Sequence, residues 1–567
     1  MVYSSDYALE YPKDATISNI LLDYNIGGVS ANSPSIIDGP TGEIVYTYSS
    51  LRLAVRRLAT YLQHDLGIGK GTVVCVLAFN TVHYPVYVHS ILAIGGVVSG
   101  LNPLHLPQVC MAFYFCYDHM YNVLQELAHA ISIAQPKHVL VGDGLLPNLQ
   151  AALKSTNAKP RIFQLSTTGS QITSSVIDVL KITKNGNTNY TPPTYAEGEI
   201  SKELAFICFS SGTSGLPKGV KLSHGNIVSN VYMHSIYLAD MFTPSAVFAM
   251  VVPFFHILGL QGFTCLYLLN GAPIVVFPKF DLPSLLVSIK RDKVSYLNVV
   301  PPIALLLLNN PLASSGDYSS LKCLMNAAAP LEQSLADRLC KRINCTLTQW
   351  YGLTEASPSV ISQREDQVHV RNTVGKILPG ITLKILDEEQ NECEHGVPGE
   401  LCIRGPNVMQ GYVGDRKLTD DTIMSDGYLR TGDIGYVDDD GFVFLVDRLK
   451  EMIKVKGNQV APAELEGILR LHDKVDDAAV CGHYIPEQAT DVPIAYITTR
   501  VPKDQHPGLF VDVIQFVRQR VASYKRIHEV RVVEEIPRNA GGKIVRRQLP
   551  GRALPTAFGG EKVIAKL

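Results

Sequence analysis

The segment that decides the fold is Ser210-Ser211-Gly212-Thr213-Ser214-Gly215-Leu216-Pro217-Lys218-Gly219, which follows an apolar run from Leu204 to Phe209. Such a run is typical of a buried strand. Glycines let the backbone approach an anion closely, so that N–H groups, hydroxyls and the ammonium of Lys218 can surround a phosphate. The segment is not the P-loop of kinases and GTPases, because Gly219 stands where that motif has Ser or Thr. We therefore predict a loop that binds a nucleoside triphosphate; a connector without a ligand is the alternative.

The composition indicates a large globular protein that binds small molecules. Its 567 residues suffice for several domains, and a formal net charge of -2 argues against nucleic acid or an acidic membrane surface as the main partner. The 11 cysteines include no Cys-x-x-Cys pair, which favours reduced thiols in an intracellular protein. Charged residues interrupt Met1 to Leu22, and polar residues, Gly and Pro interrupt Leu258 to Phe277. We therefore predict neither export nor a membrane span.

Strand-like and helical patterns alternate over most of the chain. Examples are Val73 to Phe79 followed by Tyr84 to Ile94, and Leu321 to Met325 followed by Leu331 to Ile343. The alternation predicts an α/β fold, with a large N-terminal domain of parallel or mixed sheets flanked by helices. After residue 447 shorter α+β units predict a small C-terminal domain, including a helix over Val511 to Ala522. We place the domains at 1–447 and 451–550, with a hinge at 448–450 and a tail at 551–567.

Two segments stand apart from this alternation. Residues 109–121 show no clean period, so they are either a genuine insertion or translated intron sequence. The chain ends in Ala565-Lys566-Leu567, one small-for-small change from the Ser-Lys-Leu address. This ending predicts a peroxisomal import receptor as partner and a peroxisomal location, or a cytoplasmic one if the signal is silent.

Several motifs follow the loop in a fixed order. They are Pro253-Phe254-Phe255-His256-Ile257-Leu258-Gly259, Ala328-Ala329-Pro330-Leu331, Tyr351-Gly352-Leu353-Thr354-Glu355, Thr431-Gly432-Asp433, Asp447-Arg448-Leu449-Lys450, Lys454 to Glu466 and Asn539 to Arg547. The series resembles the adenylate-forming, or AMP-binding, superfamily, in the branch of acyl-CoA synthetases, 4-coumarate-CoA ligases and firefly luciferase. The resemblance implies that ATP and Mg²⁺ activate a carboxylic acid as acyl-AMP, and that coenzyme A then takes the acyl group. It also implies that the small C-terminal domain is mobile.

The resemblance assigns the adenylation residues. Lys543 would bridge the acyl carboxylate and the α-phosphate, where a donor aimed at the transition state contributes most. Glu355 would hold Mg²⁺, and Asp433 with Arg448 would bind the ribose. The rest of the nucleotide site would be Ser210, Ser211, Gly212, Thr213, Ser214, Gly215, Lys218, Ala328, Ala329, Pro330, Tyr351, Gly352 and Thr354.

The resemblance also places the acyl and thiol sites. His256, Asn326, Ala327 and Trp350 would line the acyl pocket, where Ala327 and Trp350 add bulk relative to many family members. Lys454 and Gln459 would reach the acyl-AMP or the site of thioester formation, and Lys456 and Gly457 would contact coenzyme A. Lys450 would be the hinge about which the small domain rotates between the two half-reactions.

These features favour an ATP-dependent acid–thiol ligase for an apolar aryl, medium-chain or polyketide-derived acid. The alternatives are a stand-alone adenylation enzyme that loads a carrier protein and a luciferase-like oxygenase. A silent nucleotide binder is a further class, which the joint presence of Lys543, Glu355 and Asp433 opposes.

Overall fold

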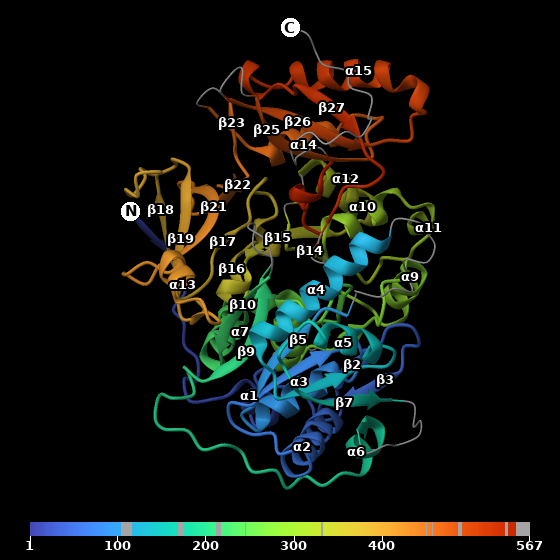
Figure 1. The fold of residues 1–567 in the computed structure, drawn as a ribbon, viewed down its shortest axis with the longest axis vertical. Helices are drawn as coiled ribbons and strands as arrows, with labels where there is room; N and C mark the ends of the chain where they lie inside the picture. The colour runs from blue at the N-terminus through green and yellow to red at the C-terminus, as the bar shows by residue number, and fades with distance from the viewer. Residues whose placement is uncertain are drawn as a thin grey trace. The chain divides into compact units, whose positions relative to one another are not determined.

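The computed structural model describes residues 1–103, 116–167, 175–210, 217–243, 245–329, 331, 333–449, 451–455, 458–485, 490–538 and 542–550 (Figure 1). Contacts divide the chain into two compact units. The larger unit comprises Tyr3–Leu383 and Ile403–Leu429, and the smaller one comprises Met1–Val2, Lys384–Cys402 and the residues from Arg430 onward. This division does not test the predicted hinge at 448–450, which stays a prediction. No helix in the described ranges is long and apolar enough to cross a membrane.

One mostly parallel sheet of the larger unit contains the strand before the predicted phosphate loop. Its strand order is β20 (Gly411–Tyr412), β10 (Lys218–Ser223), β9 (Leu204–Ser210), β5 (Val97–Leu101), β4 (Val73–Leu77), β6 (His138–Val141), β7 (Arg161–Ser166) and β8 (Val176–Asp178). The strands from β9 to β8 run parallel, whereas β10 is antiparallel to both of its neighbours. Helices α4 (Cys116–Ala134) and α5 (Leu146–Leu153) share a hydrophobic core with β4, β5 and β6.

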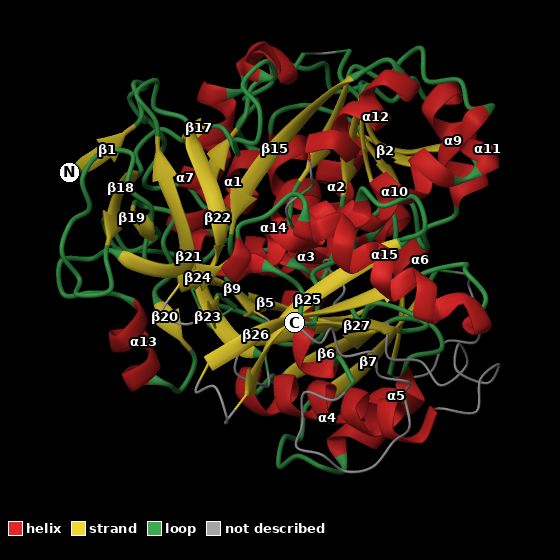
Figure 2. Ribbon diagram, turned by 90° about the horizontal axis from the view of Figure 1, so that it is seen from above, coloured by secondary structure: helices red, strands yellow, loops and turns green. Residues whose placement is uncertain are grey.

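A second sheet of the larger unit is also parallel except at its edges. Its order is β17 (Lys376–Ile377), β16 (Ser359–Ser362), β15 (Thr346–Gly352), β14 (Cys323–Asn326), β13 (Tyr296–Val299), β11 (Phe248–Met250), β12 (Ile274–Val276), β2 (Pro34–Asp38) and β3 (Ile44–Thr47). The apolar stripes of α9 (Leu282–Arg291), α10 (Pro301–Asn309) and α12 (Gln333–Ile343) pack on it. Figure 2 shows these helices gathered near β2 and β15, and α4 and α5 beside β6 and β7. The predicted α/β architecture is therefore confirmed.

Buried helices of the larger unit connect its elements. Every residue of α3 (Tyr84–Ala93) is buried, which explains its continuous apolar run, and α7 (His224–Tyr237) begins at a capping box in which Ser223 and Asn226 bond to each other's backbone N–H. Both helices pack against the π-helical segment η3 (Gly262–Tyr267), which continues α8 (Ile257–Gln261). The apolar window from Leu258 to Phe277 is thus a buried helix followed by β12, as the sequence predicts.

The smaller unit contains short antiparallel and mixed sheets. A sheet of order β1 (Val2–Ser4), β18 (Thr382–Leu386), β19 (Gly399–Arg404), β21 (Leu429–Val437) and β22 (Val443–Arg448) precedes the ribbon of β23 (Ile453–Val455) and β24 (Asn458–Val460). The last sheet is β25 (Asp477–Ile485), β26 (Thr490–Thr498) and β27 (Glu529–Val532), and α14 (Pro462–Arg470) and α15 share its hydrophobic core.

Helix α15 corrects one prediction. It spans His506–Arg518, whereas the sequence predicts a helix from Val511 to Ala522. Pro507 stands in the first turn, where its missing N–H costs nothing, so the helix begins five residues earlier. Its buried residues Leu509, Phe510, Val513 and Val517 follow the helical period.

Candidate active site

A hairpin flanks the predicted phosphate-binding loop. Strands β9 and β10 are antiparallel, and Ser210 pairs with Lys218. The hydroxyl of Ser210 is buried and has no hydrogen-bond partner in the described part of the chain. The Lys218 ammonium lies 5.3 Å from the centroid of the Tyr412 ring on β20. The hairpin therefore presents a hydroxyl and a cation on the two sides of the loop, whose residues Ser211, Gly212, Thr213, Ser214 and Gly215 lie outside the described ranges.

Tyr412 also contacts Glu355, the predicted metal ligand. Its hydroxyl donates to Oε1 of Glu355 at 3.0 Å, and the backbone N–H of Met409 donates to the Glu355 carbonyl at 2.9 Å. Burial and the neighbouring Glu355 carboxylate raise the pKa of Tyr412, so the phenol stays a donor. Lys218, Tyr412 and Glu355 thus form a connected group. No local pattern in the sequence marks Tyr412, because its contacts span up to about 190 positions of the chain.

The Glu355 carboxylate suits Mg²⁺, a hard cation that prefers oxygen ligands. It lies in the 3₁₀ turn Thr354–Ala356, and Thr354 is buried. Among the described residues no group of three or more His, Cys, Asp or Glu could hold a metal ion. A single carboxylate fits an ion that takes its other ligands from phosphates and water.

The side chains of Asn326 and Gln349 fix the turn that is predicted to bind adenine. Asn326 Nδ2 donates to the Ala329 carbonyl at 3.0 Å and to Gln349 Oε1 at 3.3 Å, and the same Gln349 oxygen accepts from the Leu331 N–H at 3.4 Å. Between these anchors Ala328 adopts a left-handed φ of 70°, which is costly for a residue with a Cβ. Asn326 and Gln349 therefore fix a strained turn at the carboxyl ends of adjacent parallel strands, where α/β sheets bind ligands. Pro330 lies outside the described residues.

Trp350 on β15 lies against a histidine that the sequence did not reveal. Its ring centroid is 5.3 Å from that of His234 on α7. His234 Nδ1 lies 2.8 Å from the Asn230 carbonyl, so Nδ1 carries a proton and Nε2 is an acceptor in the neutral ring. Burial lowers the pKa of His234 to about 4. Neither His234 Nε2 nor Trp350 Nε1 has a partner among the described residues.

Tyr351 and Ala327 are buried next to these groups. Tyr351 pairs with Ile361 across β15 and β16, and Gly352 is exposed at the end of β15. Ala327 directly follows Asn326 and is 6% exposed. The structure therefore brings Asn326, Ala327, Trp350 and Tyr351 together at the ends of β14 and β15.

His256 begins α8 in a segment that is fixed by Asn80. The Phe254 N–H donates to Asn80 Oδ1 at 2.8 Å, and Asn80 Nδ2 donates to the Val252 carbonyl at 3.0 Å. Gly100 on β5 lies so close that an added Cβ would be 2.9 Å from the Phe255 Cα. His256 keeps part of its surface exposed, yet desolvation lowers its pKa to about 4, so the ring is neutral. Its Nδ1 accepts from the Leu258 N–H at 3.4 Å.

In the smaller unit, Asp433, Arg448 and Lys543 form an electrostatic cluster. Asp433 and Arg448 face each other across β21 and β22, with 3.1 Å between Oδ1 and Nε. Lys543 is partly buried, and burial is the main cause that lowers its pKa to about 8. Arg448 lowers that pKa further, while Asp433 and Glu451 raise it. The structure thus brings together three residues that are separated by up to about 110 positions.

A buried ion network lies next to Lys543 in the chain. Arg546 donates from Nε to the Val480 carbonyl at 2.8 Å and from Nη2 to Glu466 at 2.5 Å, and it also pairs with Glu451. Nearby, Asp447 accepts from the Ala463 N–H at 2.9 Å, and burial raises the pKa of Asp447 to about 6. Arg546 belongs to the motif Asn539 to Arg547, but nothing in the sequence marks it as a partner of Glu466 and Glu451.

The predicted thiol-site residues are placed only in part. Lys454 and Gln459 pair across the ribbon of β23 and β24. Lys450, Lys456, Gly457 and the terminal residues Ala565, Lys566 and Leu567 lie outside the described ranges.

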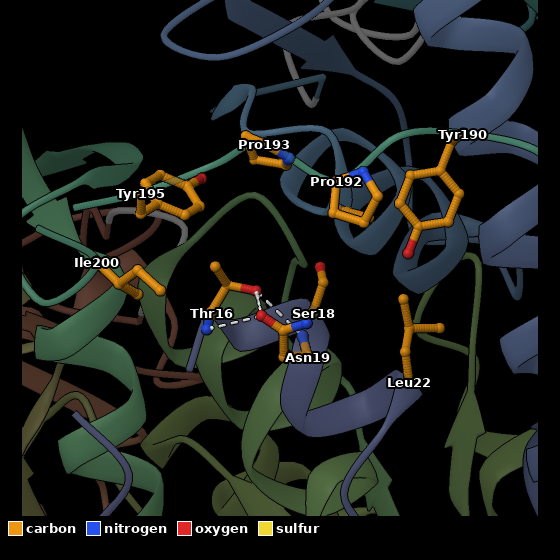
Figure 3. A pocket seen from close by; sticks show the side chains of 10 residues that line it. Thr16, Ser18, Asn19, Leu22, Tyr190, Pro192, Pro193, Tyr195 and Ile200 are labelled. Atoms are coloured by element: carbon orange, nitrogen blue, oxygen red, sulfur yellow. Dashed lines mark hydrogen bonds between the residues drawn. The ribbon is translucent and has the colours of Figure 1, made fainter. Parts of the chain in front are cut away.

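A cavity of about 250 Å³ lies elsewhere in the larger unit, and no predicted site residue lines it (Figure 3). Thr16, Ser18 and Asn19 of the α1 region (α1 is Ile17–Leu22) lie below a segment with Tyr190 and Tyr195. Thr16 donates to Asn19 at 2.7 Å and Ser18 to the His89 carbonyl at 2.8 Å, so these polar groups already have partners. The cavity therefore gives no evidence for the reaction.

The fold and these clusters match those of a known family. A family model described as "AMP-binding enzyme" matches residues 29–413, and one described as "AMP-binding enzyme C-terminal domain" matches residues 464–543. The chain therefore belongs to the AMP-binding enzyme family, as the motifs predict.

The similar proteins cover nearly the whole chain. A 4-coumarate–CoA ligase-like protein of Oryza sativa subsp. japonica is 33% identical over 95% of this chain and 93% of its own length. A 4-coumarate–CoA ligase of the same species is 34% identical over 91% and 89%. The crystal structure of an anthranilate CoA ligase, AuaEII, in complex with anthranoyl-AMP shares the fold with a TM-score of 0.82 at 22% identity, covering 94% of this chain and 96% of that one.

Proposed function

We propose that the residues described above carry out acid activation and thioester formation in two half-reactions. The protein is an AMP-forming acyl-CoA ligase by its family and relatives. In the first half-reaction a carboxylate oxygen attacks the α-phosphorus of ATP, and pyrophosphate leaves. In the second, the thiol of coenzyme A attacks the acyl carbon, and AMP leaves with the carboxylate oxygen.

The cluster of Asp433, Arg448 and Lys543 is the observation that carries the proposed roles. An Asp–Arg pair offers a carboxylate for two ribose hydroxyls and a fork of N–H donors beside it. Lys543 lies within electrostatic range of this pair and can approach a phosphate next to the sugar. Because two anions meet when a carboxylate attacks a phosphate, an ammonium at this position stabilises the transition state more than the ground state.

The larger unit would bind the triphosphate and the metal. Ser210, Lys218 and the loop between them would hold the phosphates, and Glu355, oriented by Tyr412, would hold Mg²⁺. When bound, the ion neutralises the charge of the pyrophosphate leaving group. The turn of Ala328 and Ala329 with Pro330, and Tyr351 with Gly352 and Thr354, would enclose the adenine.

The acyl group would lie between His256 and Trp350. Both His256 and His234 are neutral at physiological pH, so neither adds charge to an apolar pocket. The named substrates of two similar proteins, 4-coumarate and anthranilate, are aromatic acids. We therefore propose an apolar acid, with an aryl or aryl-propenoic acid as the first choice and Asn326, Ala327 and Trp350 as the residues that limit its size.

The thiol step and the location rest on sequence alone. Lys454 and Gln459 would serve the thioester geometry, Lys456 and Gly457 would contact coenzyme A, and Lys450 would be the hinge. Ala565, Lys566 and Leu567 would bind the peroxisomal import receptor.

The test is pyrophosphate release from ATP and Mg²⁺ with a panel of fatty, aryl and cinnamic acids, with and without coenzyme A. Acid-dependent release with an acyl-CoA product supports the proposal. Release without a thioester would favour a carrier protein as acceptor, and oxygen uptake with light would favour the luciferase-like reaction. The variant Lys543→Ala should lose about two to three powers of ten in acyl-AMP formation. It should still form the thioester from chemically prepared acyl-AMP; a variant that loses both steps equally would contradict the assigned role.

A further inference from the structure

The end of helix α12 places two cysteines together. The helix ends at Ile343, and Asn344 adopts a left-handed φ of 59°. The N–H of Asn344 donates to the Cys340 carbonyl at 2.7 Å, and the N–H of Cys345 approaches the same carbonyl at 3.4 Å. This is a Schellman-type helix end, in which the side chains of the fourth-last residue of the helix and of the residue after the left-handed one meet. Cys340 and Cys345 occupy these two positions.

The two thiols differ from most cysteines that the structure describes. Both are partly exposed, whereas Cys75, Cys208, Cys265, Cys323, Cys402 and Cys481 are buried. Contact with the Cys345 thiol lowers the pKa of Cys340, and the same contact raises the pKa of Cys345. A thiolate at Cys340 would be the nucleophile, and Cys345 the thiol that resolves its oxidised form.

Cys393 is a matched comparison within the same chain. It is also partly exposed, but burial and the Asp387 carboxylate raise its pKa. Accessibility alone therefore does not distinguish Cys340 and Cys345 from Cys393. The difference is that each thiol of the pair has a second thiol in contact with it.

We propose that Cys340 and Cys345 are a site of reversible oxidation by peroxides, which converts the two thiols to a disulfide. The Cys340 thiol loses its proton, the thiolate attacks one oxygen of hydrogen peroxide, and the O–O bond breaks. The products are a sulfenic acid and hydroxide, which takes up the proton from Cys340 and becomes water. The Cys345 sulfur then attacks the Cys340 sulfur, the S–O bond breaks, and a second water leaves with the proton of the Cys345 thiol. Two thiols and one peroxide thus give one disulfide and two waters.

The disulfide would join the end of α12 to the residue before β15. Strand β15 starts at Thr346 and contains Gln349, Trp350 and Tyr351, so the modification would lie on the strand that leads to the candidate active site. The inference does not depend on which acid or acceptor the protein uses.

Tryptic digestion distinguishes the two states directly. The chain has Arg338, Lys341 and Arg342 around the pair, so reduced protein yields Cys340 in the peptide 339–341 and Cys345 in the peptide 343–364. Full-length protein is reduced, freed of reductant, treated with hydrogen peroxide, alkylated and digested. We expect a species in which the two peptides are joined, lighter by two hydrogens than their sum, and lost after treatment with dithiothreitol.

A variant and an internal control make the outcome decisive. In Cys345→Ser the joined species should disappear, and dimedone should trap a sulfenic acid at Cys340. Cys393 in the same samples should remain alkylatable at the peroxide concentration that converts the pair, and circular dichroism should show that the oxidised chain is folded. The proposal is wrong if folded protein forms no joined species before Cys393 is oxidised, or if Cys340 pairs with other cysteines as readily as with Cys345.

Discussion

Replacing Arg546 with Met should destabilise the sheet next to Lys543. The substitution keeps most of the side-chain length but removes the charge and three hydrogen-bond interactions, with the Val480 carbonyl, Glu466 and Glu451. The Glu466 side chain is only 5% exposed, so its buried carboxylate would lose its shortest ion pair and keep the Val480 N–H at 2.8 Å and Arg470 at 3.8 Å. Breaking a buried ion pair from one side costs about 3 to 5 kcal/mol. Amides of β25 should therefore exchange with deuterium about two to three and a half powers of ten faster.

The assay is hydrogen–deuterium exchange of the native protein, read on peptides from β25 and β26. The matched control is Arg500→Met, because Arg500 pairs with Asp476 at 3.4 Å while its side chain is 87% exposed. This exposed pair should contribute less than about 1 kcal/mol, so its loss should change the exchange by less than about fivefold. The reasoning is refuted if the two variants exchange alike, because burial would then not decide the cost.

Three further predictions concern the site. Tyr412→Phe removes the 3.0 Å hydrogen bond to Glu355. We therefore expect about a tenfold or greater rise in the Mg²⁺ concentration that gives half-maximal pyrophosphate release. An unchanged Mg²⁺ titration would show that Tyr412 has no role in metal binding. The pKa of Lys543 is lowered to about 8, so its ammonium is lost as pH rises through that value, and kcat/KM for acyl-AMP formation should fall above about pH 8; a flat profile to pH 9.5 would count against the role. Trp350→Phe removes an N–H that has no partner among the described residues, so the unfolding midpoint should be nearly unchanged. The smaller ring should raise kcat/KM for bulkier acids roughly tenfold. If the preference among acids is unchanged, Trp350 is a core residue only.

The sequence predicts those elements that are determined by residues close together in the chain. The apolar run from Leu204 to Phe209 predicts a buried strand, and the structure places β9 there. The motif series also predicts that Asp433 and Arg448 belong to one site, and the structure places them 3.1 Å apart.

Other features depend on contacts between distant segments, and no local pattern marks them. Asn80 fixes the segment before His256 from about 170 positions away, and His234 meets Trp350 only because α7 packs on the second sheet. Helix α15 shows a different failure: its apolar positions fit two windows, and only Pro507 in the first turn selects the earlier one. Tertiary packing, which a single sequence does not display, decides the positions of Asn80 and His234, whereas the start of α15 depends on a local signal.

Isotope transfer tests the central claim of acid activation through acyl-AMP most directly. An accepted acid labelled with ¹⁸O in both carboxylate oxygens is incubated with the protein, ATP, Mg²⁺ and coenzyme A, and the nucleotide products are analysed by mass spectrometry. Attack of the carboxylate on the α-phosphorus predicts AMP that carries one ¹⁸O, together with unlabelled pyrophosphate. Unlabelled AMP, or ADP with labelled phosphate, would contradict the account.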